Sequence, residues 1–313
     1  GPGRPPSGRR HRRMTAPWPI IDCHHHFWRL GKGNYPWLEA ADPQPHRYGP
    51  VAPLLRDYLP GDYRRDTAAF KIAGSVHIEA EWNPADPLAE TRWLHDLAAA
   101  EGLPSAVISQ AWFARDDIAD ILAGHAAYPL VRGIRQKPAA TASPAEVRPG
   151  QPGSMSDPVW RRGYALLAKH GLHYELQTRY WHLGEAADLA RDFPDIPIVL
   201  NHAGVPEDRS DTGLAAWRAG MEEIAAQPNV SVKISGIGEA GHAWSVERQQ
   251  TVVRDVIRIF GVGRCMFASN FPVDGLVGDF ATIFNGFLDI TKDLPDDDRR
   301  KLFHDNAVRA YRL

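Results

Sequence analysis

The amino-acid sequence predicts an α/β fold, a single (β/α)8 barrel with an extended loop insertion after the first strand, and three observations support this prediction. The chain has 313 residues, an ordinary length for one such barrel. Short apolar runs alternate with amphipathic stretches, as parallel strands alternate with crossover helices. Several of these runs are continuously apolar or β-branched, which is typical of strands buried on both faces.

The strand candidates lie between Pro19 and the C-terminus. They are Ile20–His24, Ala73–Glu79, Ser105–Gln110, Leu130–Arg135, His173–Leu176, Ile196–Asn201, Val230–Ile234 and Arg264–Ala268. Eight strand–helix repeats predict closure into a barrel rather than an open sheet.

Two of the helices between these strands have recognisable beginnings. In Asp86-Pro87 and Asp157-Pro158, an aspartate that can cap a helix precedes a proline at the first helical position. The helix after Asp157 is predicted to end at Gly171, because glycine readily adopts the left-handed conformation that follows many helices.

Two stretches interrupt the strand–helix rhythm. Residues 30–70 are rich in Pro, Tyr and Asp and give no clean helix, and residues 138–156 resemble a mobile loop after the fourth strand. In a barrel of this kind, loops at the carboxyl ends of the strands carry function. Both stretches are candidate lids, with surface decoration as the alternative for the second.

Composition excludes several classes of partner. Hydrophobic residues make up 43% and charged residues 24%, and the net charge is −2, so we expect neither nucleic acid nor an anionic membrane as a partner. No apolar run reaches the roughly 18 residues that a membrane span needs.

Cys23 and Cys265 lie in apolar runs, which favours buried thiols over a disulfide. We expect a soluble, cytoplasmic protein that acts on a small molecule, and a homo-oligomer is compatible with the sequence.

The first 18 residues differ from the rest. Residues 1–13 are rich in Arg, Pro and Gly and precede Met14, which is a candidate natural start. We interpret residues 1–18 as a disordered N-terminal extension or a cloning remnant, with a nucleic-acid-binding arm as the alternative. The barrel is expected to span residues 19–313.

The strongest functional signal is the segment Asp22-Cys23-His24-His25-His26 at the end of the first strand. Side chains alternate faces along a strand, so Asp22, His24 and His26 are expected to share one face. Two imidazoles at this spacing can hold one divalent ion or polarise one substrate carbonyl. A buried histidine in a strand needs either a hydrogen-bond partner or a function, and this favours a functional role for these histidines.

Two further strands end in polar residues. An apolar strand runs into Asn201-His202-Ala203-Gly204, and another runs into Ser269-Asn270-Phe271-Pro272-Val273-Asp274. Residues at the carboxyl ends of barrel strands are typically catalytic. His202, Asn270 and Asp274 are therefore candidate catalytic residues.

These motifs together resemble the amidohydrolase superfamily and, more narrowly, its lactonase-like branch. The resemblance covers about residues 19–313 and extends to four further segments: Asn34–Leu38, His77–Ala80, Val131–Arg135 and Asn306–Tyr311. It implies hydrolysis of a lactone or a related cyclic ester, with or without a divalent metal. On this reading His24, His26 and His202 bind the metal or polarise the carbonyl.

One residue departs from the pattern of that family. The family's last strand normally ends in an aspartate that activates water, and this sequence has Asn270 at the matching position. An amide orients water but does not accept its proton at neutral pH. The base is then Asp274, or Glu79 or a histidine, or the chemistry differs. Because a negative ligand is lost, we expect zinc or manganese to be weakly bound or absent.

Five residues are candidate substrate-binding groups. Arg135 is expected to hold a substrate carboxylate, since a guanidinium binds carboxylates bidentately, with a structural salt bridge as the alternative. Lys233 lies inside an apolar strand, where burying its charge destabilises the fold unless the lysine has an ion-pair partner or a function. Glu79 is a candidate ligand or base, and Trp28 and Tyr35 are expected to line the pocket.

The leading hypothesis is a lactonase-type hydrolase of a small metabolite, with an acidic one among the candidates. A metal-dependent decarboxylase of an unsaturated or aromatic acid is the alternative enzyme, in which the same histidines hold the metal. A non-catalytic barrel that binds a ligand is the third hypothesis, and Asn270 is the residue that keeps it open.

Overall fold

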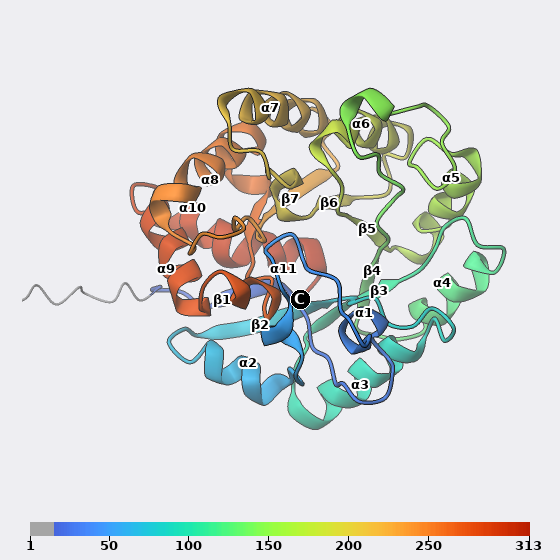
Figure 1. The fold of residues 1–313 in the computed structure, drawn as a ribbon, viewed down its shortest axis with the longest axis horizontal. Coiled ribbons are helices and arrows are strands. Elements are labelled where there is room, and N and C mark those ends of the chain that lie inside the picture. Colours follow the sequence, from blue (N-terminus) through green and yellow to red (C-terminus); the bar gives the residue numbers. More distant parts are fainter. Residues whose placement is uncertain (1–15) are drawn as a thin grey trace, which may run out of the picture.

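The computed structural model describes residues 16–313, and in it eight parallel strands form one sheet, ordered β1 to β8 along the chain. The strands are β1 (Ile20–His25), β2 (Ile72–Ile78), β3 (Ala106–Gln110), β4 (Val131–Arg135), β5 (His173–Leu176), β6 (Ile198–Leu200), β7 (Val230–Ile234) and β8 (Cys265–Phe267). Helices surround the strands on the outside (Figure 1). The predicted (β/α)8 barrel is confirmed.

The helices follow the strands in the order that right-handed crossovers require. They are α1 (Pro36–Glu39), α2 (Pro60–Asp66), α3 (Ala89–Glu101), α4 (Ile118–Ala126), α5 (Pro158–Ala165), α6 (Leu183–Asp192), α7 (Asp211–Ala225), α8 (Val246–Phe260), α9 (Phe280–Ile290), α10 (Asp296–Arg300) and α11 (Asn306–Tyr311). Among the helices of residues 16–313, none combines the length and the apolar character that a bilayer crossing needs.

The first and last strands are joined by residues that directly follow β8. The Asn270 N–H donates to the His24 carbonyl at 2.7 Å. The N–H and the hydroxyl of Ser269 both donate to the Asp22 carboxylate, at 2.9 and 2.6 Å. These bonds close the barrel at the carboxyl ends of its strands.

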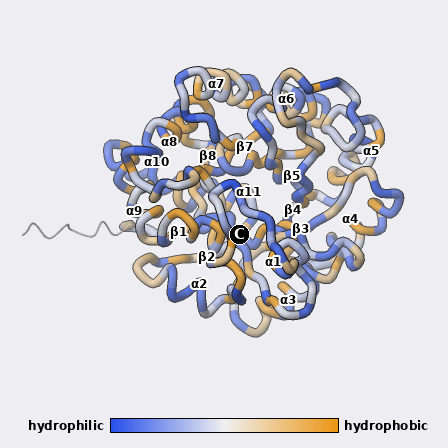
Figure 2. Tube along the Cα trace, viewed as in Figure 1, coloured by the Kyte–Doolittle hydropathy of each residue, from blue (hydrophilic) through white to orange (hydrophobic). Residues whose placement is uncertain are grey.

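Two apolar cores hold the barrel together. The smaller one fills the barrel interior and includes Ile21, Cys23 and Met266, and the larger one lies between the strands and the outer helices. Figure 2 shows apolar and polar residues alternating along the outer helices, as expected for elements with one buried face. Cys23 and Cys265 are both buried and free, as the sequence predicts.

The predicted helix starts have different outcomes. Asp157 is the N-cap of α5, and its carboxylate accepts a hydrogen bond from the Val159 N–H, so that prediction is confirmed. The prediction at Asp86 is wrong, because α3 begins only at Ala89. The Asp86 N–H instead reaches the Asn83 carbonyl in a preceding turn. An aspartate before a proline therefore does not by itself mark the start of a helix, because here a preceding asparagine already forms a turn.

The predicted helix end at Gly171 also needs correction. Helix α5 ends at Ala165, and a separate 3-10 turn, Ala168–His170, leads to Gly171. Gly171 does have the expected left-handed conformation, with φ at +62°.

The long insertion after β1 is more ordered than the sequence suggests. It contains α1, a 3-10 turn at Ala52–Leu54, and α2, whereas we expected no clean helix. Trp28 and Tyr58 bridge its two ends in antiparallel fashion. Short helices that begin with proline lack an extended apolar period, so periodicity alone does not reveal them. In Figure 1 this segment, drawn in blue, crosses the mouth of the barrel.

The packed part of the chain begins slightly earlier than we predicted. Residues 1–15 of the proposed N-terminal extension lie outside the described residues. Trp18, which we had placed in that extension, is buried and packs against Phe303.

Candidate active site

A cavity of about 170 Å³ opens at the carboxyl ends of the strands. Its lining includes Arg135, the last residue of β4, and three residues just beyond strand ends, His26, His202 and Asn270. The insertion after β1 contributes Trp37, Pro45, His46, Arg47 and Val51. The insertion therefore covers the site, as we expected for a lid. The loop at 138–156 does not line this cavity, and its Thr141 is bonded to His182 instead.

Strand β1 contains a bulge just before its histidines. Asp22 pairs with Ser75 on β2 and His25 pairs with His77, so three steps along β1 match two steps along β2. An extra residue of this kind reverses the inward–outward alternation of the strand beyond it.

The bulge corrects one expectation about the faces of β1. Cys23 packs inside the barrel, and the Asp22 carboxylate is directed outward, where it accepts a hydrogen bond from the Tyr63 hydroxyl of α2 at 2.8 Å. Asp22 therefore does not share a face with His24 and His26. Those two histidines do lie together, with ring centroids 5.2 Å apart.

His24, His26 and His202 form a cluster above the barrel core. The His24 ring lies 4.6 Å from the His202 ring, between centroids. Burial, reinforced by nearby cations such as Lys233 and Arg135, holds the pKa of all three well below the usual 6.5. The three imidazoles are therefore neutral at physiological pH.

Hydrogen bonds fix the orientation of two of these rings. His26 Nδ1 donates to the Ile78 carbonyl at 2.7 Å, so its Nε2 carries a lone pair. His202 Nδ1 lies 2.9 Å from the Ser235 hydroxyl, which can either donate or accept. Ser235 thus permits either tautomer of His202.

The backbone around His202 is tightly constrained. His202, Ala203 and Val205 have φ values of +56°, +53° and +54°, a left-handed conformation that costs energy for these residue types. Gly236 lies directly against the ring, and a Cβ built there would be 2.5 Å from His202 Nδ1. Strain and close contact together hold the imidazole in place.

The chemistry of the histidine cluster suits a divalent ion. Both ring nitrogens of His24 are buried without a partner among the described residues. Ring nitrogens anchored by a carbonyl or a hydroxyl, as in His26 and His202, are typical of metal ligands. As the side chains stand, however, no group of three His, Cys, Asp or Glu within residues 16–313 is arranged to hold a metal. The donor types fit zinc, and a bound ion would need small ring movements.

Asn270 and Asp274 form a pair at the end of β8. The Asn270 amide donates to the Asp274 carboxylate at 2.9 Å, and Asn270 lines the cavity. Burial raises the pKa of Asp274 from 3.8 to about 7, although Arg47 and hydrogen bonds from Asn270 and Tyr48 oppose this rise. Asp274 therefore gains and loses a proton near neutral pH.

Asp274 is not the cap of the following helix. Helix α9 is capped by Asp279, whose carboxylate accepts from the Thr282 N–H at 2.7 Å. Asp274 instead lies in a 3-10 turn, Val273–Leu276, and its carboxylate faces Asn270.

Arg135 both lines the cavity and forms a buried ion pair. Its Nε lies 3.0 Å from Glu79 Oε1, and its Nη2 donates to the Glu79 carbonyl at 2.8 Å. The structural salt bridge that the sequence left open as the alternative is therefore present, and binding of a substrate carboxylate by Arg135 stays a prediction. Arg132, three residues earlier, bonds to the Tyr311 and Pro129 carbonyls away from the cavity.

Three predicted substrate-binding residues are found outside the cavity. Lys233 lies inside the barrel, with Nζ 2.5 Å from Glu175, and is fully buried. Trp28 and Tyr35 are also fully buried, bonded to the Arg56 carbonyl and to Glu90. Direct substrate contact by these three side chains is not supported, because each is enclosed by protein.

The sequence pointed to none of the cavity residues Arg47, Lys137 and Gln177 individually, nor to Tyr48, which bonds to Asp274. Arg47 and Tyr48 belong to the insertion after β1, which has no period from which side-chain direction could be derived. The only available signal was the position of that segment after a catalytic strand end.

Comparison with known proteins shows the family of this chain. The family model described as "Amidohydrolase" matches residues 21–313. An "Uncharacterized protein y4mH" of Sinorhizobium fredii is 38% identical over 94% of this chain and 98% of its own length. An "L-fucono-1,5-lactonase" of Burkholderia ambifaria is 28% identical over 94% of this chain and 95% of its own length.

A solved structure shows the same architecture. A crystal structure of an amidohydrolase from Burkholderia multivorans with bound zinc is 26% identical, covers 95% of this chain and 100% of its own, and has a TM-score of 0.78. The family match spans nearly the whole barrel, including each strand end that lines the cavity. This chain belongs to the amidohydrolase family.

Proposed function

We propose that this protein hydrolyses the ring ester of an aldonolactone, a cyclic ester of a sugar acid. The observation that carries the proposal is the Asn270–Asp274 pair beside the histidine cluster, because a carboxylate with a pKa of about 7 is suited to take a proton from water. The resemblance to proteins named L-fucono-1,5-lactonase supports a 1,5-lactone as the substrate.

In the proposed reaction, the lactone carbonyl lies against the imidazoles and a water molecule attacks it. Asn270, whose amide group is held by Asp274, orients that water through its carbonyl oxygen. Asp274 accepts a proton from the water as the new C–O bond forms. When the ring C–O bond then breaks, the departing ring oxygen takes up this proton as a hydroxyl, and the product is an open-chain hydroxy acid whose carboxyl group ionises in solution.

The developing negative charge on the carbonyl oxygen needs a donor or a cation. When Ser235 donates to His202 Nδ1, the His202 Nε2–H is free to donate to that oxygen. Arg135 also lines the cavity and adds a fixed positive charge. In the other tautomer of His202, with Nδ1–H donating to Ser235, a zinc ion held by His24, His26 and His202 would polarise that oxygen instead.

The cavity favours a neutral, hydroxyl-rich lactone over a strongly acidic one. Two of its cations are already paired, Arg135 with Glu79 at 3.0 Å and Lys137 with Glu81 at 3.3 Å. An additional substrate carboxylate would have to compete with these pairs. The pairing also counts against the decarboxylase hypothesis, in which an arginine must be free to hold the departing carboxylate.

A lactone screen with the variant Asp274→Asn tests the proposal. The wild-type protein is expected to hydrolyse at least one sugar 1,5-lactone, read from the proton released into a pH indicator. The variant should lose about 100-fold in kcat, which is the usual contribution of a general base. In the wild-type protein, kcat should rise with pH through a midpoint of about 7, because the carboxylate is the active form.

Asp279→Ala is the matched control, because it removes a nearby carboxylate that only caps a helix. It should cost about 1 kcal/mol of stability and leave kcat near that of wild type. Retention of kcat in Asp274→Asn would refute the role of Asp274. Release of carbon dioxide without lactone opening would favour the decarboxylase instead.

A further inference from the structure

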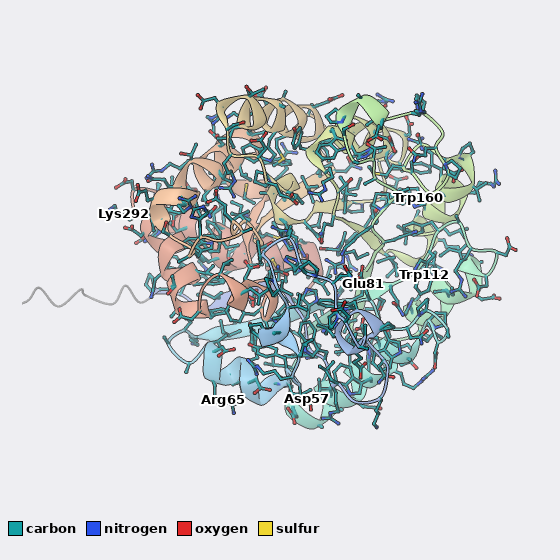
Figure 3. The ribbon with its side chains drawn as sticks, in the orientation of Figure 1. Asp57, Arg65, Glu81, Trp112, Trp160 and Lys292 are labelled. Carbon is teal, nitrogen blue, oxygen red and sulfur yellow. The ribbon has the colours of Figure 1, made fainter. Side chains whose placement is uncertain are left out.

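A second cavity of about 370 Å³ adjoins the first at the mouth of the barrel. The two cavities are adjacent, because they share four lining residues: Trp37, Glu81, Arg135 and Lys137. Figure 3 shows Glu81 close to the barrel axis and Trp112, which lines only the second cavity, farther toward the outer helices. The second cavity has no part in the proposed hydrolysis.

Three tryptophans line this second cavity: Trp37, Trp82 and Trp112. The indole of Trp37 is fixed by a hydrogen bond from Nε1 to the Ala80 carbonyl at 2.8 Å. The Arg115 guanidinium lies 4.9 Å from the Trp112 ring centroid, and so covers part of that ring. Aromatic rings held in this way offer rigid, apolar contact area to a ligand.

Gln110 provides a polar group that the protein itself leaves unused. It is the last residue of β3, is only 4% exposed, and lines the second cavity. Its Nε2 is buried without a partner among the described residues. A buried amide donor without a partner destabilises the folded state, and a bound ligand with an acceptor oxygen would remove this cost.

Carboxylates line the same cavity as Gln110. Glu79 and Glu81 both contribute to the lining, and each can accept a hydrogen bond from a ligand hydroxyl. Glu81 has φ at +60°, a left-handed conformation that is costly for a glutamate and that places it where the two cavities meet. Strained residues of this kind concentrate at ligand sites.

We propose that the second cavity binds a sugar ring attached to the lactone, so that the substrate is a glycosyl-substituted aldonolactone. A pyranose has apolar C–H faces that match the tryptophans, and hydroxyls that both accept from Gln110 and donate to the glutamates. A plain aromatic ring would leave Gln110 unpaired. This inference rests on the proposed lactone hydrolysis. The glycosidic bond is unchanged by that reaction, because only the ring ester opens.

Binding of stable product analogues tests the second cavity independently of catalysis. The probes are gluconate and lactobionate, which share the same sugar acid, while lactobionate carries an additional galactosyl ring. By titration calorimetry, lactobionate should bind the wild-type protein at least about 10-fold more tightly, which corresponds to about 1.4 kcal/mol from the additional ring contacts. Gln110→Leu and Trp112→Ala should each reduce this ratio to about threefold or less.

Trp181→Leu is the control for the tryptophan variant. Trp181 lies near the barrel mouth and bonds to Thr141, but it lines neither cavity. Its substitution should leave the affinity ratio as in the wild-type protein. Equal affinity for the two probes, no measurable binding of lactobionate, or a ratio that Gln110→Leu does not change would overturn the inference. One outcome separates the two proposals. If no lactone is hydrolysed, but the wild-type protein prefers lactobionate over gluconate and the variants lose this preference, the proposed reaction is refuted while the sugar subsite is supported.

Discussion

Asn270 and Asp274 show how a single residue type changes the chemistry of a strand end. The resemblance to the family leads one to expect a carboxylate at position 270, where this chain has an amide that donates to Asp274 at 2.9 Å. Hydrogen bonding from the amide lowers the pKa of Asp274, but burial outweighs it and the result is about 7. The carboxylate therefore lies at position 274 instead of position 270, and its pKa is close to neutral pH.

The variant Asn270→Asp would put two carboxylates within hydrogen-bond distance of each other. Two such groups share one proton, and the second proton is lost only at a higher pH. We expect the midpoint of the pH–kcat profile to rise by about one unit or more, and zinc affinity to increase because a negative ligand is added beside the histidines. Kinetics from acid to mildly alkaline pH and elemental analysis of the purified variant measure the two effects.

The wild-type protein provides the reference for this metal measurement. We expect it to carry less than one equivalent of zinc or manganese, removable by a chelator, because its three candidate ligands are neutral imidazoles. A full equivalent that survives chelation would mean that a carboxylate completes the wild-type site. An unchanged pH midpoint in Asn270→Asp would mean that positions 270 and 274 are not coupled.

At the scale of single residues, the sequence predicted some cavity residues and missed others. His26, His202, Asn270 and Arg135 line the cavity because each lies at or just beyond the end of a strand, and strand ends can be read from apolar runs. Arg47 could not be found in this way, since it lies in the insertion after β1. Lys233 was assigned to substrate because its partner, Glu175, is distant in sequence and invisible to a local pattern.

At the scale of elements, the bulge in β1 decides where the histidines point. Simple alternation would have placed Asp22 beside the histidines, but the extra residue turns Asp22 outward. In that position its carboxylate accepts from Ser269 and from Tyr63, and so links β1 to the end of β8 and to α2. Bulges depend on pairing between distant strands, so a single strand sequence does not reveal them.

Asp22→Ala should therefore weaken the barrel seam more than the site. It would leave the Ser269 N–H, the Ser269 hydroxyl and the Tyr63 hydroxyl without their acceptor, at a cost of about 3 kcal/mol or more. Tyr63→Phe is the matched control, because it removes only one of these bonds and should cost about 1 kcal/mol. Urea unfolding measures the free energy of unfolding of both variants. Equal costs for the two variants would show that Asp22 does not close the seam.

The accuracy of the predicted element boundaries depended on how clearly each apolar run is delimited in the sequence. Strands β5 and β7 were predicted with the bounds that the structure shows, because their apolar runs are flanked by clear breaks. The region between β1 and β2 was not resolved into α1 and α2, because helices of four and seven residues carry too few apolar positions to show a period.

At the scale of the whole molecule, the site makes stability depend on pH. Burial holds the pKa of His24, His25, His26 and His202 well below 6.5. Unfolding lets these four imidazoles bind protons as the pH falls below 6.5, so the unfolded state gains stability there. Asp274 acts in the opposite direction, because its folded pKa of about 7 lies above its ordinary value of 3.8.

We therefore expect a steep loss of stability on the acid side. Below about pH 6 the unfolded state binds a net excess of about three protons, four from the histidines less one held by Asp274 in the folded state, which corresponds to about 4 kcal/mol per pH unit. Above about pH 8 all five groups carry the same charge in both states, so these groups make no further contribution to the slope. Asp274→Asn removes the opposing carboxyl, so its stability should fall more steeply with acid than that of the wild type. Urea unfolding of both proteins across this range measures the two slopes. Equal stability of the wild-type protein at about pH 5 and pH 7 would mean that the imidazoles are protonated, or accessible, in the folded state.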